Sequence, residues 1–272
     1  MRINIFALAV GAALAAASAR AHGPQVQITN DNNKIVTRQI ILDDPYSTSL
    51  TDPKSVYVIP VAQLDGVWYS QPNSDIDPIL MQAEFPSGPG VAYGYDQIKA
   101  GPQSIAAGST LSENFTAGLK LWNGSTFVDP GTEQIGVFPG DQTAPTDQAI
   151  TSDSGPFTGI TYPAIAVNYE PDDHFEARFR LLGDGTNPLT PSQDGVYLLS
   201  LQLTSTQAGL APSDPFYFLL RKNASDATTI AAVNALTTAR GIAPELVQYV
   251  PEPASLLLLV VGAVLFIAKR RR

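Results

Sequence analysis

Residues 196–204, which read VYLLSLQLT, and residues 216–220, which read FYFLL, decide the fold of this chain. Both runs are short and rich in aliphatic and aromatic side chains, as β-strands are. Residues 196–204 are nearly continuously apolar at first, which is typical of a strand in the centre of a sheet. We therefore expect this segment to be a central strand and residues 216–220 to be its neighbour.

Two hairpins are predicted earlier in the chain. Residues 25–29 and 35–41 are β-rich runs separated by Asn30-Asp31-Asn32-Asn33, a composition suited to a tight turn. Residues 119–122 and 125–128 flank the dipeptide Asn123-Gly124. This dipeptide favours the positive φ angles of a type I′ turn, so it predicts a hairpin with a two-residue loop.

The remaining pattern is also that of a β protein. Further strands are predicted at residues 55–61, 66–69 and 175–181; in the last, apolar residues alternate with Glu and Arg, as in a strand with one wet face. The 22 prolines and 21 glycines are too many for a helical protein. Long loops are expected at residues 71–78, 85–90, 126–156 and 183–195. We therefore expect an all-β fold, an antiparallel β-sandwich with long loops, over residues 22–224.

One late helix is predicted. Ser225 or Asp226 can cap its start, and Gly241 followed by Pro244 stops it. Its apolar stripe is expected to consist of Ile230, Val233 and Leu236. We interpret residues 225–249 as a helix that closes one end of the sandwich, followed by a spacer. The alternative is an exposed stalk.

The last 23 residues contain three features in a fixed order. A Pro-Glu-Pro triplet comes first, and its prolines stop any helix from propagating upstream. Residues 254–268 are apolar and correspond to about 22 Å of helix. Basic residues end the chain and can hold that end in the cytoplasm. The motif consists of Val250, Pro251, Glu252 and Pro253, and the basic cluster consists of Lys269, Arg270, Arg271 and Arg272.

Residues 250–272 resemble the PEP-CTERM sorting signal of exported bacterial proteins. The resemblance implies recognition by an exosortase and cleavage near the Pro-Glu-Pro motif. It also implies a transmembrane helix at residues 254–268 in contact with membrane lipid, and a setting in which exopolysaccharide is a candidate partner. The alternative is an ordinary tail anchor.

The N-terminus agrees with export. Met1-Arg2 is a short basic start, residues 3–17 are almost all apolar or small, and Ala19-Arg20-Ala21 fits the small-x-small cleavage rule. Residues 1–21 are therefore expected to be a signal peptide that signal peptidase removes. Cleavage after Ala21 makes His22 the first mature residue.

Charge and cysteine content narrow the function. Of the 16 basic residues, two lie in the leader and four at the C-terminus, and one of the 25 acidic residues lies in the C-terminal 23. The segment between therefore carries a net charge near −14, which argues against nucleic-acid partners. The chain has no cysteine, which rules out disulfides, thiolate catalysis and Cys-ligated zinc.

A metal site is the second hypothesis. An N-terminal His22 offers an amine and an imidazole that together chelate copper or zinc. His174 is the only other histidine, and Asp172 shares its face if the strand extends back that far. This set resembles the copper site of CopC-type carriers, and His22-Gly23 is similar to the mature start of lytic polysaccharide monooxygenases. Because His174 is the forced second imidazole, we expect the first strand to start beside the beginning of the strand at residues 175–181, which brings His22 within side-chain reach of His174.

No catalytic motif is recognisable, and paired acids such as Asp43 and Asp44 are ordinary in so acidic a chain. We interpret Trp68, Tyr69 and Trp122 as core aromatics; the alternative is that they stack on sugars. We interpret Asp184–Asn187 and Asp194-Gly195 as ordinary turns; the alternative is that they are calcium-binding loops. We therefore expect a non-enzymatic protein without a cofactor, exported and membrane-anchored, and then on the cell surface or in the extracellular matrix. The alternatives are a copper or zinc protein and a copper-dependent oxidase of polysaccharide.

Overall fold

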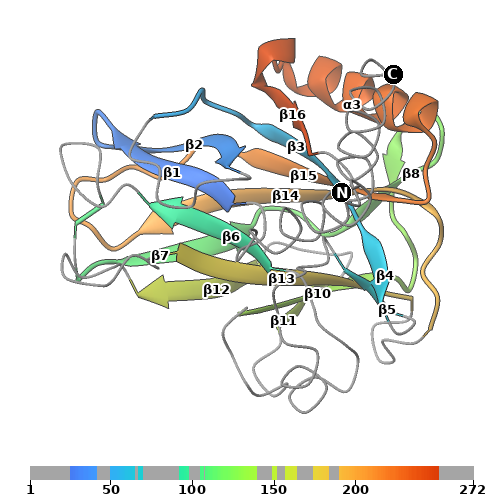
Figure 1. Ribbon diagram of the computed structural model, residues 1–272, viewed down its shortest axis with the longest axis horizontal. Coiled ribbons are helices and arrows are strands. Elements are labelled where there is room, and N and C mark those ends of the chain that lie inside the picture. Colours follow the sequence, from blue (N-terminus) through green and yellow to red (C-terminus); the bar gives the residue numbers. More distant parts are fainter. Residues whose placement is uncertain are drawn as a thin grey trace, which may run out of the picture.

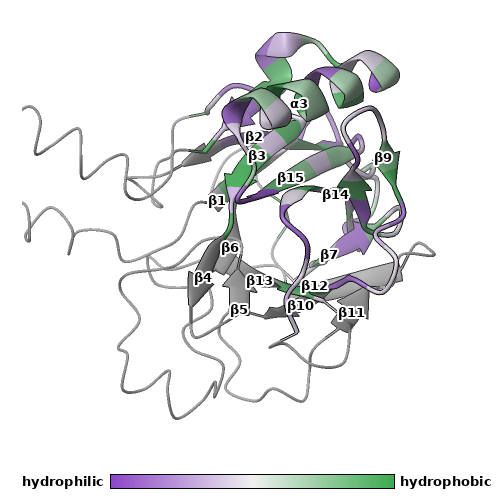
Figure 2. Ribbon diagram, turned by 90° about the vertical axis from the view of Figure 1, so that its right-hand side faces the viewer, coloured by the Kyte–Doolittle hydropathy of each residue, from purple (hydrophilic) through white to green (hydrophobic). Residues whose placement is uncertain are grey.

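Two β-sheets lie face to face, and helix α3 (Asp226–Arg240) covers the outer face of one of them (Figures 1 and 2). We call the sheet that α3 covers the central sheet. We call the second sheet, which lies on the side away from α3, the outer sheet. The computed structural model describes residues 25–41, 50–64, 67–69, 92–97, 105–106, 108–139, 149–151, 157–163, 174–183 and 190–250.

The outer sheet has the strand order β11-β10-β13-β6-β1-β2, and β5 joins β4 to β13. Its strands are β1 (Gln25–Asp31), β2 (Lys34–Ile41), β4 (Ala62–Leu64), β5 (Val67–Tyr69), β6 (Ala92–Gln97), β10 (Gln134–Pro139), β11 (Ala149–Thr151) and β13 (His174–Leu182). The predicted segments 25–29, 35–41 and 175–181 lie in this sheet, as do the described residues 67–69 of the predicted segment 66–69.

The central sheet has the order β12-β7-β14-β15-β3-β16, and β8 joins β9 to β14. Its strands are β3 (Val56–Pro60), β7 (Thr110–Phe115), β8 (Lys120–Trp122), β9 (Phe127–Val128), β12 (Phe157–Pro163), β14 (Gly195–Ser205), β15 (Phe216–Lys222) and β16 (Val247–Tyr249). The pairing of β14 with β15 confirms the expected central pair.

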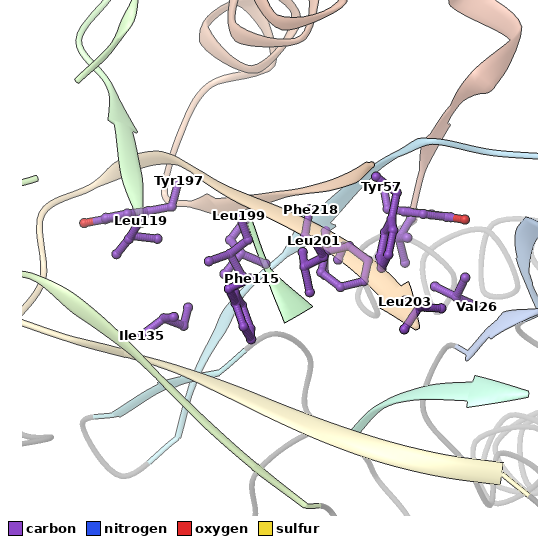
Figure 3. Close-up of a cluster of buried hydrophobic side chains, with 14 of the residues drawn as sticks. Val26, Tyr57, Phe115, Leu119, Ile135, Tyr197, Leu199, Leu201, Leu203 and Phe218 are labelled. Atoms are coloured by element: carbon purple, nitrogen blue, oxygen red, sulfur yellow. The ribbon is translucent and has the colours of Figure 1, made fainter. Parts of the chain in front are cut away.

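The apolar run of β14 is explained by burial on both faces. Tyr197 and Leu199 point into the cluster between the two sheets, whereas Val196 and Leu198 point into a second cluster beneath α3. The neighbouring strands β3 and β15 alternate in the same way. Figure 3 shows side chains of β14 and β15 filling the space between the sheets. Because α3 covers the second face of the central sheet, β14 has apolar residues on both faces and does not alternate with polar ones.

The prediction of antiparallel sheets is wrong in detail, because both sheets are mixed. β3 runs parallel to β15 and to β16, and β1 runs parallel to β6. These strands are far apart in the sequence, so no tight turn dictates their direction. The short-range pairs, such as β1 with β2, are antiparallel as expected.

Helix α3 has the predicted ends. The Ser225 side chain accepts a hydrogen bond from the Thr228 amide, and Gly241 ends the helix with φ +63°. Its buried face consists of Thr229, Ala232, Val233 and Leu236. Ile230 was placed in this stripe wrongly: it is 49% exposed, because it lies about 100° around the helix from Thr229. The helix lies on the face of the central sheet, and the expectation that it closes an end of the sandwich is also wrong.

The turns of the two expected hairpins differ from each other. Asn32 and Asn33 both have positive φ, so the β1–β2 turn is as tight as predicted. The β8–β9 hairpin forms, but its loop has four residues, since Trp122 pairs with Phe127. Gly124 alone has positive φ there, and the Asn123 side chain accepts hydrogen bonds from the Ser125 and Thr126 amides. The expected type I′ turn is therefore wrong.

Segments read as loops or as a spacer also contain strands. β10 and β11 lie within residues 126–156, and β16 lies within the supposed spacer before Pro251. Of the other expected loops, residues 71–78 and 85–90 lie outside the described residues, as do the expected signal peptide and the apolar segment 254–268. Among the residues that are described, no helix is long and apolar enough to cross a membrane.

Candidate functional site

The body of the protein meets the predicted sorting motif at Val250. This residue is 6% exposed and belongs to the cluster between the two sheets. Its amide donates a hydrogen bond of 2.9 Å to the Val58 carbonyl oxygen of β3. Pro251, Glu252, Pro253 and the cluster Lys269, Arg270, Arg271 and Arg272 lie outside the described residues. The first residue of the motif is therefore also a core residue.

The three residues before Val250 form β16 at one edge of the central sheet. Val247, Gln248 and Tyr249 pair in parallel with Val56, Tyr57 and Val58. Val247 packs on the cluster beneath α3, whereas Tyr249 is 51% exposed. A strand at this position joins the two clusters, because its successive side chains point to opposite faces of the sheet.

Two further contacts hold the chain just before β16. The Ser55 amide donates to the Leu246 carbonyl oxygen at 2.9 Å, and the Lys54 ammonium donates to the Glu245 carbonyl oxygen at 2.6 Å. Together with the bond from Val250, they fasten both ends of β16 to one stretch of chain.

The residues of the metal hypothesis are only partly described. His174 is the first residue of β13 and pairs with Asp96 of β6. His22 and Asp172 lie outside the described residues. The expected neighbourhood of the first strand and β13 is wrong, because β6 lies between β1 and β13. Two strand spacings, about 10 Å, therefore separate β1 from β13. Within the described ranges, no group of three or more His, Cys, Asp or Glu could hold a metal ion.

A buried polar cluster ties the start of β14 to the outer sheet. Glu133, 4% exposed and next to β10, accepts hydrogen bonds from the Gln193 amide and from the Tyr197 hydroxyl, the latter at 2.8 Å. The Lys222 ammonium, also buried, donates to the Ser192 and Gln193 carbonyl oxygens. Buried charges with this many partners are stabilised in place, so the cluster fixes the chain ahead of β14.

Electrostatics within this cluster are consistent with a structural role. The Lys222 ammonium lies 3.1 Å from the Asp194 carboxylate. Its hydrogen bond lowers the pKa of Asp194 below the ordinary value. Burial, aided by the hydrogen bond to Glu133, raises the pKa of Tyr197 well above its ordinary value. The Asp194 carboxylate is therefore engaged by an ammonium. Asp194 lies at a bend and Gly195 is the first residue of β14, so the interpretation of this pair as a turn is wrong.

A second buried tyrosine joins the sheets at the opposite end of the same core. The Tyr57 hydroxyl donates to the Arg38 carbonyl oxygen of β2 at 2.7 Å, and the Lys54 carbonyl oxygen lies 3.2 Å away. Figure 3 shows the hydroxyls of Tyr57 and Tyr197 pointing outward from opposite ends of the cluster. Sequence reasoning missed Glu133, which lies in a segment expected to be a loop, and Lys222, whose only signal was a charged residue just after the predicted strand 216–220.

Trp122 is 8% exposed and packs against Phe127 with ring centroids 5.2 Å apart, which confirms it as a core aromatic. The side chains of Trp68 and Tyr69 lie outside the described part, as do residues 184–187. No protein-family model matches this chain. No curated protein matches it either.

Proposed function

We propose that this chain is a non-enzymatic exported bacterial protein whose β-rich body is delivered to the cell surface or extracellular matrix by its C-terminal signal. The observation that carries the proposal is the position of Val250. The described core clusters draw on residues up to Val250, and the Pro-Glu-Pro motif starts at the next residue. A signal at this point can be cut from the body without removing any residue of those clusters.

The acidic surface and the missing cysteines support the same function. A segment with a net charge near −14 is soluble and is repelled by anionic surfaces. A chain without cysteine needs no oxidation to fold in the envelope or outside the cell. Attachment of the protein to the membrane therefore depends on the C-terminal residues. The membrane is the proposed transient anchor, and an exosortase is the proposed processing partner.

Mass spectrometry of the mature protein tests this function in cells that make an exosortase. The expected product begins at His22 and ends close to residues 251–253. Replacing Pro251 and Pro253 together by alanine should abolish the C-terminal cut and leave a membrane-bound precursor. The matched control replaces Pro212 and Pro215, two exposed prolines between β14 and β15, and should be processed normally.

One further variant tests the basic cluster. Replacing Lys269, Arg270, Arg271 and Arg272 by serine removes an attraction to the inner leaflet worth about 1 kcal/mol for each residue. Retention during export should therefore weaken. A mature protein that keeps residue 272 in wild-type cells would refute cleavage at the motif and leave only a tail anchor.

A further inference from the structure

We propose that β16 is a latch on the chain that leads into the processing motif: it must leave β3 before a protease can cut at residues 251–253. This inference rests on the proposed function, because it concerns how the same C-terminal signal is processed. It adds a requirement that the signal alone does not imply, namely partial opening of the folded body. The latch consists of residues 245–250.

The latch is fastened along its whole length. Its first residue, Glu245, accepts a hydrogen bond from Lys54, and its last residue, Val250, donates one to Val58. Between them, three residues of β16 pair with β3. The partners all lie in residues 54–58, a segment that is itself held on its other side by β15. The chain that leads into the motif therefore belongs to the sheet.

Burial adds to these hydrogen bonds at the residue nearest the motif. Val250 is 6% exposed between the two sheets, and Val247 packs beneath α3. The two valines point to opposite faces of the central sheet, so the segment cannot slide out of one cluster without leaving the other. Release of Val250 must therefore break β16 away from β3.

A protease needs more of the chain than the bond it cuts. Substrate segments bind in extended form with their backbone groups available, and cleavage in native proteins concentrates where the chain is exposed and weakly held. Residues immediately upstream of the motif are the paired residues of β16, and no spacer separates them from Pro251. The rate of cutting should then follow the fraction of molecules in which the latch is open.

A disulfide lock tests the latch in the full-length chain, which has no cysteine of its own. Val56 and Val247 are paired neighbours in the cluster beneath α3, so Val56→Cys with Val247→Cys places both sulfurs on one face. Adjacent strands lie about 4.8 Å apart, within the range that a disulfide bridges. The matched control is Ser112→Cys with Thr204→Cys, a half-buried pair between β7 and β14.

Two readouts are compared for the oxidised and reduced forms of each variant in isolated membranes. The first is processing at residues 251–253 by the exosortase of those membranes. The second is cutting at the Tyr249–Val250 bond by an added protease that cleaves after aromatic residues, which reports opening without the exosortase. Oxidation of the lock should slow both reactions by about tenfold or more, because both track the open population. Oxidation of the control pair should change neither.

The remaining outcomes separate the latch from the sorting function. If oxidation slows the Tyr249–Val250 cut but leaves processing unchanged, opening does not gate processing and the proposal is overturned. If oxidation changes neither reaction, no latch exists. If the unmodified chain is never processed while its Tyr249–Val250 cut still responds to the lock, the proposed sorting function fails, and the gating role fails with it.

Discussion

Replacing Tyr57 by phenylalanine removes a single hydroxyl that joins the central sheet to the outer sheet. Tyr57 lies in β3 and is fully buried, and its hydroxyl donates to the Arg38 carbonyl oxygen of β2. Its ring also contacts Phe216 and Phe218, with centroids 6.3 and 5.6 Å away. Phenylalanine keeps these ring contacts, so the substitution isolates the hydrogen bond between the sheets.

The expected loss of stability follows from this geometry. A hydrogen bond between neutral groups contributes about 1 kcal/mol, and leaving a buried acceptor without its donor costs about 1–3 kcal/mol. We therefore expect Tyr57→Phe to lower the free energy of unfolding by about 1.5 kcal/mol. For a body of this size, each kcal/mol corresponds to a Tm change of about 2–4 °C. The Tm should fall by about 3–6 °C.

Urea unfolding of residues 22–250 measures this change, with Tyr217→Phe as the matched control. Tyr217 lies on the other face of the central sheet, beneath the Arg240 guanidinium, which is 5.8 Å from its ring centroid. Its hydroxyl makes no hydrogen bond within the described residues, so the control should lose less than about 0.5 kcal/mol. Equal losses in the two variants would refute a special role for the bond between the sheets.

The dependence of stability on alkaline pH is a second test of the burial of Tyr57. Burial raises the pKa of Tyr57 above its ordinary value of 10.0. The folded state therefore keeps a proton that the unfolded chain loses above pH 10.0, so stability is fully present below that pH and falls as the pH rises further. Tyr57→Phe should weaken this decline, and Tyr197, whose pKa is raised in the same direction, should account for part of what remains.

Three other predictions concern the C-terminal strand β16, Gly183 and Asp194. A chain ending after Val250 should match the stability of the longer protein, whereas one ending after Leu246 should lose about 3 kcal/mol, because it lacks the β16 pairing and a buried valine; calorimetry compares them. Gly183→Ala should lower Tm markedly, because its Cβ would lie 2.5 Å from a backbone oxygen; an unchanged Tm contradicts this. Asp194→Asn should flatten the stability curve below pH 4. Lys222 lowers the pKa of Asp194, so its contribution is present above the ordinary 3.8 and is lost as pH falls through the folded-state value.

The sequence predicted the elements whose signals are local. The apolar run in β14 reflects burial on both faces, and Ser225 and Gly241 cap α3 through bonds to residues within one turn. The tight turn at Asn32 follows from the positive φ that asparagine tolerates. Each of these features depends on the chemistry of a few consecutive residues, which a single sequence contains.

The features that sequence reasoning missed depend on distant partners. β10 contains Gly136 and ends in Pro139, which resembles a loop until β13 pairs with it. β16 has only three residues, and its pairing with β3 supplies the signal that its composition lacks. The candidate site is similar: Val250 was recognisable as part of a motif, but its burial depends on a fold that brings together both sheets.

The parallel pairing of β3 also sets the order in which this protein can fold. Val56 lies early in the chain, yet its neighbours in the sheet, Tyr217 and Val247, are made much later. When the chain is made from its N-terminus, β3 has no partner strand on either side until nearly the whole body has been made. Such long-range pairing slows folding and leaves an unfinished sheet open to other chains. A chaperone that binds the emerging chain would act in the interval before the final strands are made.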